Sequence, residues 1–474
     1  MKDNTKPGKL IEELFKIIGA HRGVFKQERP YQRMIGLVLG ELFNFGRHTI
    51  TQSLLGLGIM EGDWSAWYRL FSKPRFEEES LNEILVEETV KGARENEPYV
   101  MVIDGTPVIR TGLKIPGSCW LTSPRTPAFR RGIERIQRFV HGAWLTPLED
   151  GYSRAIPIRW VPAFPPKAVV SEAEPCKEWE AGQQVLSWVR TCLDGIGRGK
   201  QILMVLADGA FDVLELWREL AQRTILITRT ARNRSLYYLP AEYAGRGRPP
   251  SYGEKAPHPA DWLHAGLRNW PALWVRVRGK DIRMRFQVLG PFVREGLPER
   301  PLFLIVVKGR HKQVGKRKLY YKHRGPSFYL VNAIFKNGSW QLPLPIENIL
   351  AWLWQRWEIE VAHREMKTGL GLGEKQCWNR RSAITSVQFS AWVYAILVLA
   401  AWRTWGLRGL ANTRTPWWSG SKRWSFNTMW RQYRSQLWGS QPFRTLWLPS
   451  SHDWLKKELW LAGLANSISF SSRI

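Results

Sequence analysis

Two runs of apolar, β-prone residues in this chain each lead into an aspartate that is followed by glycine. The runs are YVMVID, which ends at Asp104, and QILMVLAD, which ends at Asp208. Short apolar runs of this kind are typical of buried strands, and a following glycine favours a turn. We therefore predict that each aspartate lies at the mouth of a buried strand, where open α/β sheets keep their functional sites. The pattern favours an α/β core.

A third acidic residue, Glu360, lies in a helical pattern instead. In LWQRWEIEVAHREMK, Arg356, Glu360, His363 and Lys367 recur at helical spacing, so they share one helix face. A surface ion pair between Arg356 and Glu360 would explain two of them and would contribute about half a kcal/mol. The surrounding residues are rich in Trp, Leu, Ile and Val, which favours a buried helix whose polar stripe faces a cleft.

The chain is long and strongly basic. Its 474 residues include 70 Lys and Arg against 41 Asp and Glu, a formal net charge of +29. A length of this size allows roughly two to four domains, and the charge makes a polyanion the first candidate partner. A basic protein such as a ribosome-associated factor would have the same balance, but nothing in such a protein requires the three acids. Together the acids and the charge favour cleavage of nucleic acid with two divalent cations. Such cations bind carboxylate oxygens and lie about 3.5–4 Å from each other.

Cysteine spacing and one apolar stretch bear on the compartment. The four cysteines lie far apart, and their spacing predicts neither a zinc site nor a disulfide framework: Cys119, Cys176, Cys192 and Cys377. No secretory signal opens the chain, so we expect a cytoplasmic protein with reduced cysteines. The 21 uncharged residues Ser382–Trp402 are long enough to cross a bilayer. Hydroxyl side chains in the first half of this stretch favour a buried core helix, and we expect no membrane partner.

The first half of the chain divides into two regions. Residues 1–95 are mostly helical, and Asp63 is a plausible cap for a helix rich in aromatic residues. This pattern resembles a helix-turn-helix that binds DNA, although any small helical domain would look the same. Residues 96–230 alternate strands and helices, which describes the first part of an α/β core.

The second half divides into three regions. Residues 231–342 alternate like strands between Pro/Gly-rich loops, and we interpret them as a β-rich insertion rather than as more of the core. The core resumes over residues 343–405, with one helix predicted from near Ile346 to Thr368. Residues 406–474 interleave Trp with Arg, which suits either a nucleic-acid surface or the packing of a helical subdomain.

One loop of the insertion carries charge of a single sign. KGRHKQVGKRKLYYKHRG contains eight Lys and Arg residues and no acid. A loop that is merely solvated usually includes some acids, whereas a loop that contacts phosphates has a reason to exclude them. We therefore expect Lys316, Arg317 and Lys318 to bind DNA.

A family resemblance follows from these motifs. The spacing R-x3-E-x6-K at Arg356, Glu360 and Lys367 resembles the Tyr-Arg-Glu-Lys motif of bacterial insertion-sequence DDE transposases, although Leu353 stands at the tyrosine position. VIDGTPV and VLADGAF resemble the two aspartate blocks of the same family. The resemblance covers about residues 99–400 and leaves both ends of the chain outside it.

The resemblance implies a fold and a mechanism. The fold would be an α/β, ribonuclease-H-like mixed sheet with a β-rich insertion before the helix of the catalytic glutamate, flanked by N- and C-terminal helical regions. Asp104 would bridge two Mg²⁺ ions, for which Mn²⁺ could substitute, and Asp208 and Glu360 would each complete one side. Arg356 and Lys367 would hold phosphates of the transposon end. The DNA partners would be the element ends and the target, and the protein would act as a homodimer beside the bacterial nucleoid. His363 has no assigned role beyond a hydrogen bond.

Two other classes of protein fit the same residues. One is a ribonuclease-H-like nuclease that cuts DNA without joining strands. The other is a DNA-binding derivative that no longer catalyses a reaction, against which the presence of all three acids argues.

Overall fold

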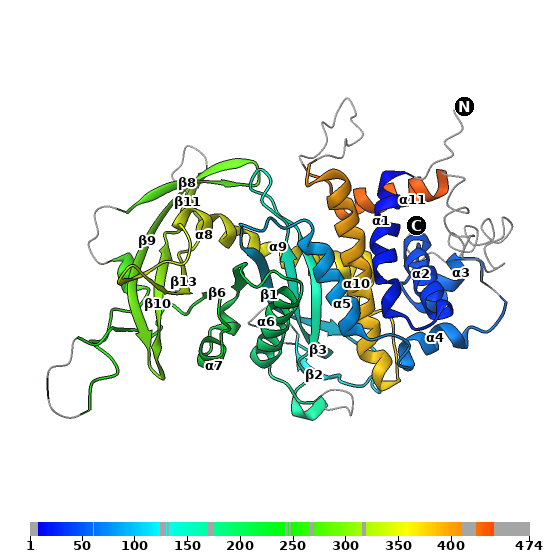
Figure 1. Cartoon of the computed structure of the whole chain (residues 1–474), viewed down its shortest axis with the longest axis horizontal. Coiled ribbons are helices and arrows are strands. Elements are labelled where there is room, and N and C mark those ends of the chain that lie inside the picture. The colour runs from blue at the N-terminus through cyan, green and yellow to red at the C-terminus, as the bar shows by residue number, and fades with distance from the viewer. Residues whose placement is uncertain are drawn as a thin grey trace.

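The computed structural model of the chain describes residues 8–59, 61–123, 129, 132–168, 174–241, 245, 248–264, 270–314, 319–408 and 423–439. Three parts follow one another in Figure 1. Helices from the N-terminal region gather around one long helix, a mixed sheet lies at the centre, and further strands extend that sheet away from the helices.

The N-terminal region is helical, as predicted. Its elements are α1 (Lys9–Ala20), η1 (His21–Val24), α2 (Glu28–Phe43), α3 (Ile50–Gly56), α4 (Ser65–Ser72) and α5 (Glu78–Val90). Asp63 lies one residue before the N-cap of α4, and its Oδ1 accepts the backbone N–H of Ser65 at 2.9 Å. The cap prediction was therefore correct to within one residue. Helices α1, α4 and α5 all contact α10 (Arg380–Trp405) (Figure 1).

The sheet contains eleven strands in the described part of the chain. They are β1 (Tyr99–Ile109), β2 (Cys119–Thr122), β3 (Ile133–Leu145), β4 (Ala155–Pro162), β5 (Leu203–Ala207), β6 (Thr224–Arg229), β7 (Tyr237–Tyr238), β8 (Ala272–Val277), β9 (Lys280–Arg294), β10 (Leu297–Val307) and β13 (Ser327–Asn332). Two hairpins lie outside it: β11 (Arg310–Val314) with β12 (Leu319–Arg324), and β14 (Ile334–Lys336) with β15 (Ser339–Gln341).

The core of this sheet has the topology that the resemblance implies. Its strands lie in the order β4-β3-β1-β5-β6, with β1, β5 and β6 parallel and β3 antiparallel to both β1 and β4. Asp150 and Gly151, in the turn between β3 and β4, both have positive φ, as a tight hairpin turn requires. The ribonuclease-H-like α/β fold is thus confirmed.

Helices cover the two faces of β1 differently. Side chains alternate between the faces of a strand. The odd-numbered residues of β1 face α6 (Glu178–Gly195), because a Cβ added to Gly182 of α6 would lie 3.6 Å from Ile103 Cδ1. The same Cβ would come within 2.6 Å of Phe211, so glycine is needed for this close approach. The even-numbered residues face α9 (Trp357–Gly369), whose Lys367 bonds to Thr106. Asp104 is therefore on the α9 face.

The β-rich segment is attached to the core more closely than the sequence indicated. Strand β13 pairs with β6 of the core, and β10, β9 and β7 follow in the same sheet. Residues 231–342 are rich in strands as expected, yet they extend the core sheet instead of forming a sheet of their own. The apolar faces of β10 and β13 supply fully buried side chains such as Leu304 and Leu330, which gain more when they continue an existing core than when they build a small new one.

The helix predicted from Ile346 to Thr368 is interrupted. The structure has α8 (Ile346–Leu353), a 3-10 turn η5 (Trp354–Arg356) and then α9. Three bulky residues, Trp352, Trp354 and Trp357, flank the junction, and Trp354 Nε1 lies 3.1 Å from the Met284 sulfur of β9. Trp352 and Trp354 pack partly buried against the core at this break, whereas Trp357 is half exposed.

The long apolar stretch forms α10, as predicted. By length and composition α10 could cross a membrane, but 94% of its most apolar window is buried inside the protein. The side chain of Asn379 caps its N-terminus by accepting the N–H of Ser382 at 3.0 Å, and the helix ends at Gly406, whose φ is 63°. The interpretation as a core helix is confirmed. The four cysteines are free, also as expected.

The described end of the chain supports packing for part of the Trp/Arg-rich region. Trp424 and Trp430, before and within α11 (Phe426–Gly439), are 1% and 7% exposed. Arg434 donates to the carbonyl oxygens of Leu42 and Asn44. Residues 409–422 and 440–474, which include Trp417 and Trp418, lie outside the described residues.

Candidate active site

The strand register brings the two aspartates next to each other. Strands β1 and β5 run parallel, with Val102 opposite Leu206, so Asp104 and Asp208 are each two residues further on. Asp208 directly follows β5, as predicted. We expected Asp104 to end its strand, and this was wrong. Strand β1 continues to Ile109 because β3 pairs with it over its whole second half.

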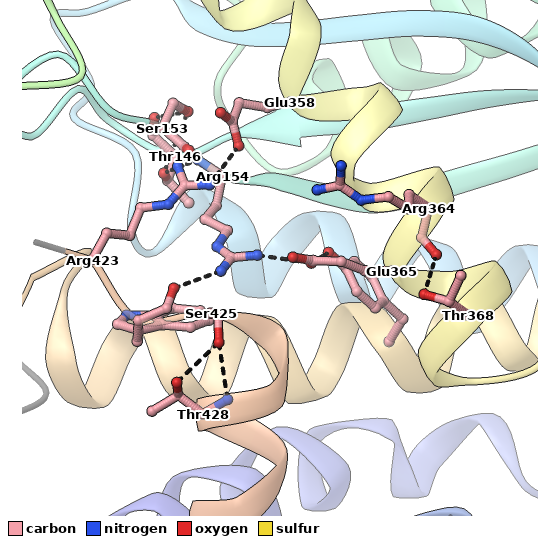
Figure 2. A network of polar contacts seen from close by, with 12 residues as sticks. Thr146, Ser153, Arg154, Glu358, Arg364, Glu365, Thr368, Arg423, Ser425 and Thr428 are labelled. Atoms are coloured by element: carbon pink, nitrogen blue, oxygen red, sulfur yellow. Dashed lines mark hydrogen bonds and ion pairs between the residues drawn. The ribbon is translucent and has the colours of Figure 1, made fainter. Parts of the chain in front are cut away.

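Glu360 reaches the site from α9, which is fixed by contacts on its other side (Figure 2). There Arg154 donates to Glu365 at 2.8 Å and Arg423 donates to Glu358 at 3.1 Å. Both carboxylates lie on α9, and Arg154 is almost wholly buried. Removing one partner of such a buried pair costs about 3–5 kcal/mol, which indicates how firmly the helix is held.

The three acids interact electrostatically. The pKa of Asp104 is raised to about 7, first by burial and then by repulsion from Asp208; Glu360 also raises it, while Arg356 opposes the rise. Carboxylates that crowd one another resist ionisation, because each charge disfavours the next. Asp104 is therefore within electrostatic range of both other acids.

Two of the acids are engaged by protein partners in this structure. Arg356 donates to Glu360 at 2.5 Å, and Asp208 accepts the backbone N–H of Ala210 at 2.9 Å. No group of three or more His, Cys, Asp or Glu side chains within the described ranges is arranged to hold a metal ion. The donor set nevertheless fits a hard divalent cation, since it offers carboxylate oxygens. A cation here would offset the repulsion that contributes to the raised pKa of Asp104.

Other residues expected to bind DNA have different surroundings. Lys367 is half-buried and donates to Thr106 at 2.8 Å, one turn of α9 beyond His363. A pocket beside Arg356 is lined by two further arginines and three aromatic side chains: Arg229, Arg278, Tyr329, Trp354 and Trp357. Lys316, Arg317 and Lys318 lie outside the described residues, between β11 and β12.

Sequence reasoning missed Glu178, a fourth acid at the start of α6. Its carboxylate lies against β1, because a Cβ on Gly105 would come within 1.5 Å of Glu178 Oε1. Burial raises its pKa, Arg138 at 3.5 Å lowers it, and Asp208 raises it further. No spacing along the chain links residue 178 to the other acids, so only the fold reveals this neighbour.

Sequence reasoning also assigned His363 nothing beyond a hydrogen bond. The structure gives it such a bond, 2.8 Å long, to His141 of β3. Its other ring nitrogen, Nδ1, lies 4.0 Å from Asp104 Oδ2. His141 is directly opposite Asp104 in the β1–β3 ladder, so a strand pairing that the sequence could not specify brings it to the site.

Comparison with known proteins decides the family. A model of the DDE superfamily endonucleases matches residues 24–280, more than half of the chain. The chain belongs to the DDE superfamily endonucleases. The match includes both aspartates and ends before the basic loop and the α9 residues. Enzymes of this superfamily cleave DNA and generally use divalent metal ions.

Other comparisons add little to this assignment. No curated protein matches the chain. A cryo-EM structure of a piggyBac transposase synaptic complex with hairpin DNA aligns with 96% of this DDE endonuclease chain and 83% of that chain, at 10% sequence identity and a TM-score of 0.40. So distant a likeness adds nothing to what the strand order shows.

The Asp104 environment predicts a pH-dependent stability in the absence of metal. The folded-state pKa of about 7 exceeds the ordinary value of 3.8, so between these values only the folded protein binds the proton. Protonated Asp104 therefore stabilises the folded protein fully below about pH 4, and this contribution is lost as the pH rises through 7. We expect Asp104→Asn to melt above wild type at pH 8 in EDTA, with a gap that closes toward pH 5. The gap is at most about 4 kcal/mol, from about 1.4 kcal/mol per unit of pKa. A gap independent of pH would show that Asp104 ionises normally.

Proposed function

We propose that the chain is a transposase that cuts and joins DNA at insertion-sequence ends by two-metal phosphoryl transfer. The observation that carries this proposal is Asp104, a half-buried carboxylate whose ionisation Asp208 and Glu360 oppose. Such a group is poised to bind cations, and it lies in a chain of a DNA-cleaving superfamily. We assign Asp104, Asp208 and Glu360 as the catalytic ligands of two Mg²⁺ ions, for which Mn²⁺ could substitute.

The residues of the chain divide the work in this proposal. When bound, the metal ions would activate the attacking water or DNA 3′-hydroxyl and stabilise the leaving oxygen. Asp104 holds the central position because its strand lies between β5 and β3. Asp208 approaches from the end of β5, and α9 carries Glu360 to the same face of β1. The contacts of Glu358 and Glu365 keep α9 in place during this step.

Arg356 has two possible partners in this mechanism. It pairs with Glu360 in the free protein, and a DNA phosphate would offer it another anion. Exchange of Glu360 for a phosphate would free the carboxylate for the cation at the moment when substrate arrives. Lys367, half-buried beside Thr106, would contact the same DNA end as a point charge. The pocket with Arg229 and Arg278 continues this basic surface.

The wider proposal concerns partners and location. Joining two element ends to a target requires both ends to be held at once, so we propose a homodimer on synapsed DNA. We place the protein in the bacterial cytoplasm beside the nucleoid, where its substrate lies.

Strand transfer tests this proposal. Purified protein, Mg²⁺ and a labelled DNA end taken from the region flanking the gene should yield the label joined to plasmid. Short inverted repeats close to both ends of the gene would identify that DNA. Cleavage without joining would point instead to a nuclease, and binding without cleavage to a non-catalytic derivative.

The basic loop has its own prediction. Neutralising Lys316, Arg317 and Lys318 together should weaken binding to all DNA sequences alike, because phosphate contacts carry no base information. If all three contact phosphates, the slope of log affinity against log salt should flatten by about 2.7, from roughly 0.9 per contact on duplex DNA. Titrations of fluorescent duplexes at several salt concentrations measure this slope. An unchanged slope would mean that the loop is merely solvated.

A further inference from the structure

Two buried histidines lie directly behind the Asp104 carboxylate. His141 is fully buried and His363 is 7% exposed. Their rings meet through His141 Nδ1 and His363 Nε2, 2.8 Å apart, and His363 Nδ1 faces Asp104 Oδ2 at 4.0 Å. The three groups therefore form a line from β3 through α9 to β1.

The hydrogen bonds around the pair determine which nitrogens carry protons. The two nitrogens that meet share one hydrogen bond, so one of them donates its N–H and the other accepts with a lone pair. Burial also lowers the pKa of both histidines below the ordinary value. If His363 donated to His141, His363 would turn a bare lone pair toward the Asp104 carboxylate. His141 would then carry its own N–H on Nε2, which is buried and has no partner among the described residues. An unmet buried donor costs about 1–3 kcal/mol.

The opposite arrangement avoids both costs. His141 donates from Nδ1 to His363 Nε2, and His363 carries its proton on Nδ1, which faces Asp104 Oδ2. The unpartnered Nε2 of His141 then carries only a lone pair and no proton. The His141 ring itself stacks on the Trp160 ring, with centroids 4.7 Å apart. Ligating carboxylates are commonly held by hydrogen-bond donors of this kind behind them.

We propose that His141 and His363 form a relay that positions the Asp104 carboxylate for its divalent cation, with His363 as the donor. The inference rests on the proposed function, because it assigns Asp104 as a metal ligand. At 4.0 Å the last contact is longer than a hydrogen bond, and movement of either side chain by about 1 Å closes it. His363 is a positioning residue, since it acts through Asp104.

A packing role alone does not account for these residues. The ring of His141 stacks on Trp160 and is hydrogen-bonded at its edge to His363. An apolar ring such as phenylalanine could fill the same space and would remove the buried His141 Nε2, which has no partner among the described residues. The two rings instead keep their polar atoms, and these lie in line with the Asp104 carboxylate.

Two substitutions at one position separate positioning from packing. His363→Leu removes the donor, whereas His363→Asn keeps an N–H near the place of Nδ1. We expect His363→Leu to weaken Mn²⁺ binding to DNA-free protein by 10–100-fold, the usual effect of losing such a partner, and His363→Asn to remain within a few-fold of wild type. Electron paramagnetic resonance measures free and bound Mn²⁺, and the Mn²⁺ concentration that half-activates DNA cleavage should shift in parallel.

A matched control comes from another buried histidine. His21 lies in η1 of the N-terminal region. It bonds to the Ile17 carbonyl oxygen and accepts the indole N–H of Trp392 from α10. We expect His21→Leu to lower the melting temperature and to leave Mn²⁺ affinity unchanged. If His363→Leu does not fold, His363→Gln replaces it, because the longer amide reaches toward His141 and away from Asp104.

The outcomes are distinguishable. The relay would be overturned if His363→Leu or His363→Gln bound Mn²⁺ with wild-type affinity. It would also be overturned if His363→Asn lost as much affinity as the variant without a donor. In either case, cleavage of DNA by the wild-type protein would leave the proposed function standing. If the wild-type protein neither bound Mn²⁺ nor cleaved DNA, the proposed function and the relay would both fail.

Discussion

Asp104→Asn is expected to abolish DNA cleavage by several orders of magnitude while leaving DNA binding nearly intact. An amide supplies no anionic oxygen, and the proposed chemistry needs that oxygen on a ligand shared by both cations. Asp104 is also the acid whose pKa is raised both by burial and by the two other carboxylates. Gel-based cleavage and binding assays on the same labelled DNA give both quantities.

A matched control and a stability measurement complete this test. Asp281→Asn removes the same charge at an exposed position in the β8–β9 hairpin, and it should cleave like wild type. Asp104→Asn should fold and, without metal at pH 8, melt higher than wild type. Cleavage by Asp104→Asn at the wild-type rate would reject the assigned mechanism.

The second large effect is expected at Arg356 and Lys367. If Arg356 is only the ion-pair partner of Glu360, Arg356→Ala should cost about 0.3–0.5 kcal/mol of stability and little activity, as half-exposed helix pairs do. If both cations grip phosphates beside the metal ions, Arg356→Ala and Lys367→Ala should each lose cleavage by orders of magnitude and melt close to wild type. The DNA end supplies the partner that is absent from the free protein, so melting alone would not reveal the defect.

Arg364 offers the control on the same helix. Its side chain is exposed (Figure 2), and Arg364→Ala changes the net charge of α9 by the same amount as Arg356→Ala or Lys367→Ala. We expect it to keep cleavage within a few-fold. Normal excision by both Arg356→Ala and Lys367→Ala would leave Glu360 as an ordinary ion-pair residue.

Sequence patterns predicted the elements that local composition determines. The apolar runs before Asp104 and Asp208 are strands, and the uncharged Ser382–Trp402 stretch lies in the buried helix α10. A run of buried side chains has a characteristic length and period whatever surrounds it.

Features set by tertiary pairing were not predictable in this way. Strand β1 passes beyond Asp104 because β3 continues to pair with it, and nothing near Asp104 encodes that partner. The break at η5 depends on where the neighbouring indoles pack. His141 and Glu178 reach the site only through the β3 register and the start of α6, so no motif along the chain could have grouped them with Glu360.

The proposed function requires that Asp104, Asp208 and Glu360 share one pair of metal ions. A crystal of the protein with a DNA end and Mn²⁺ tests it directly, because the anomalous signal locates the ions without reference to mechanism. We expect two peaks about 3.5–4 Å apart, both in contact with Asp104, with Asp208 on one side and Glu360, released from Arg356, on the other. Peaks remote from Asp104, or Glu360 still paired with Arg356 beside bound Mn²⁺, would contradict it.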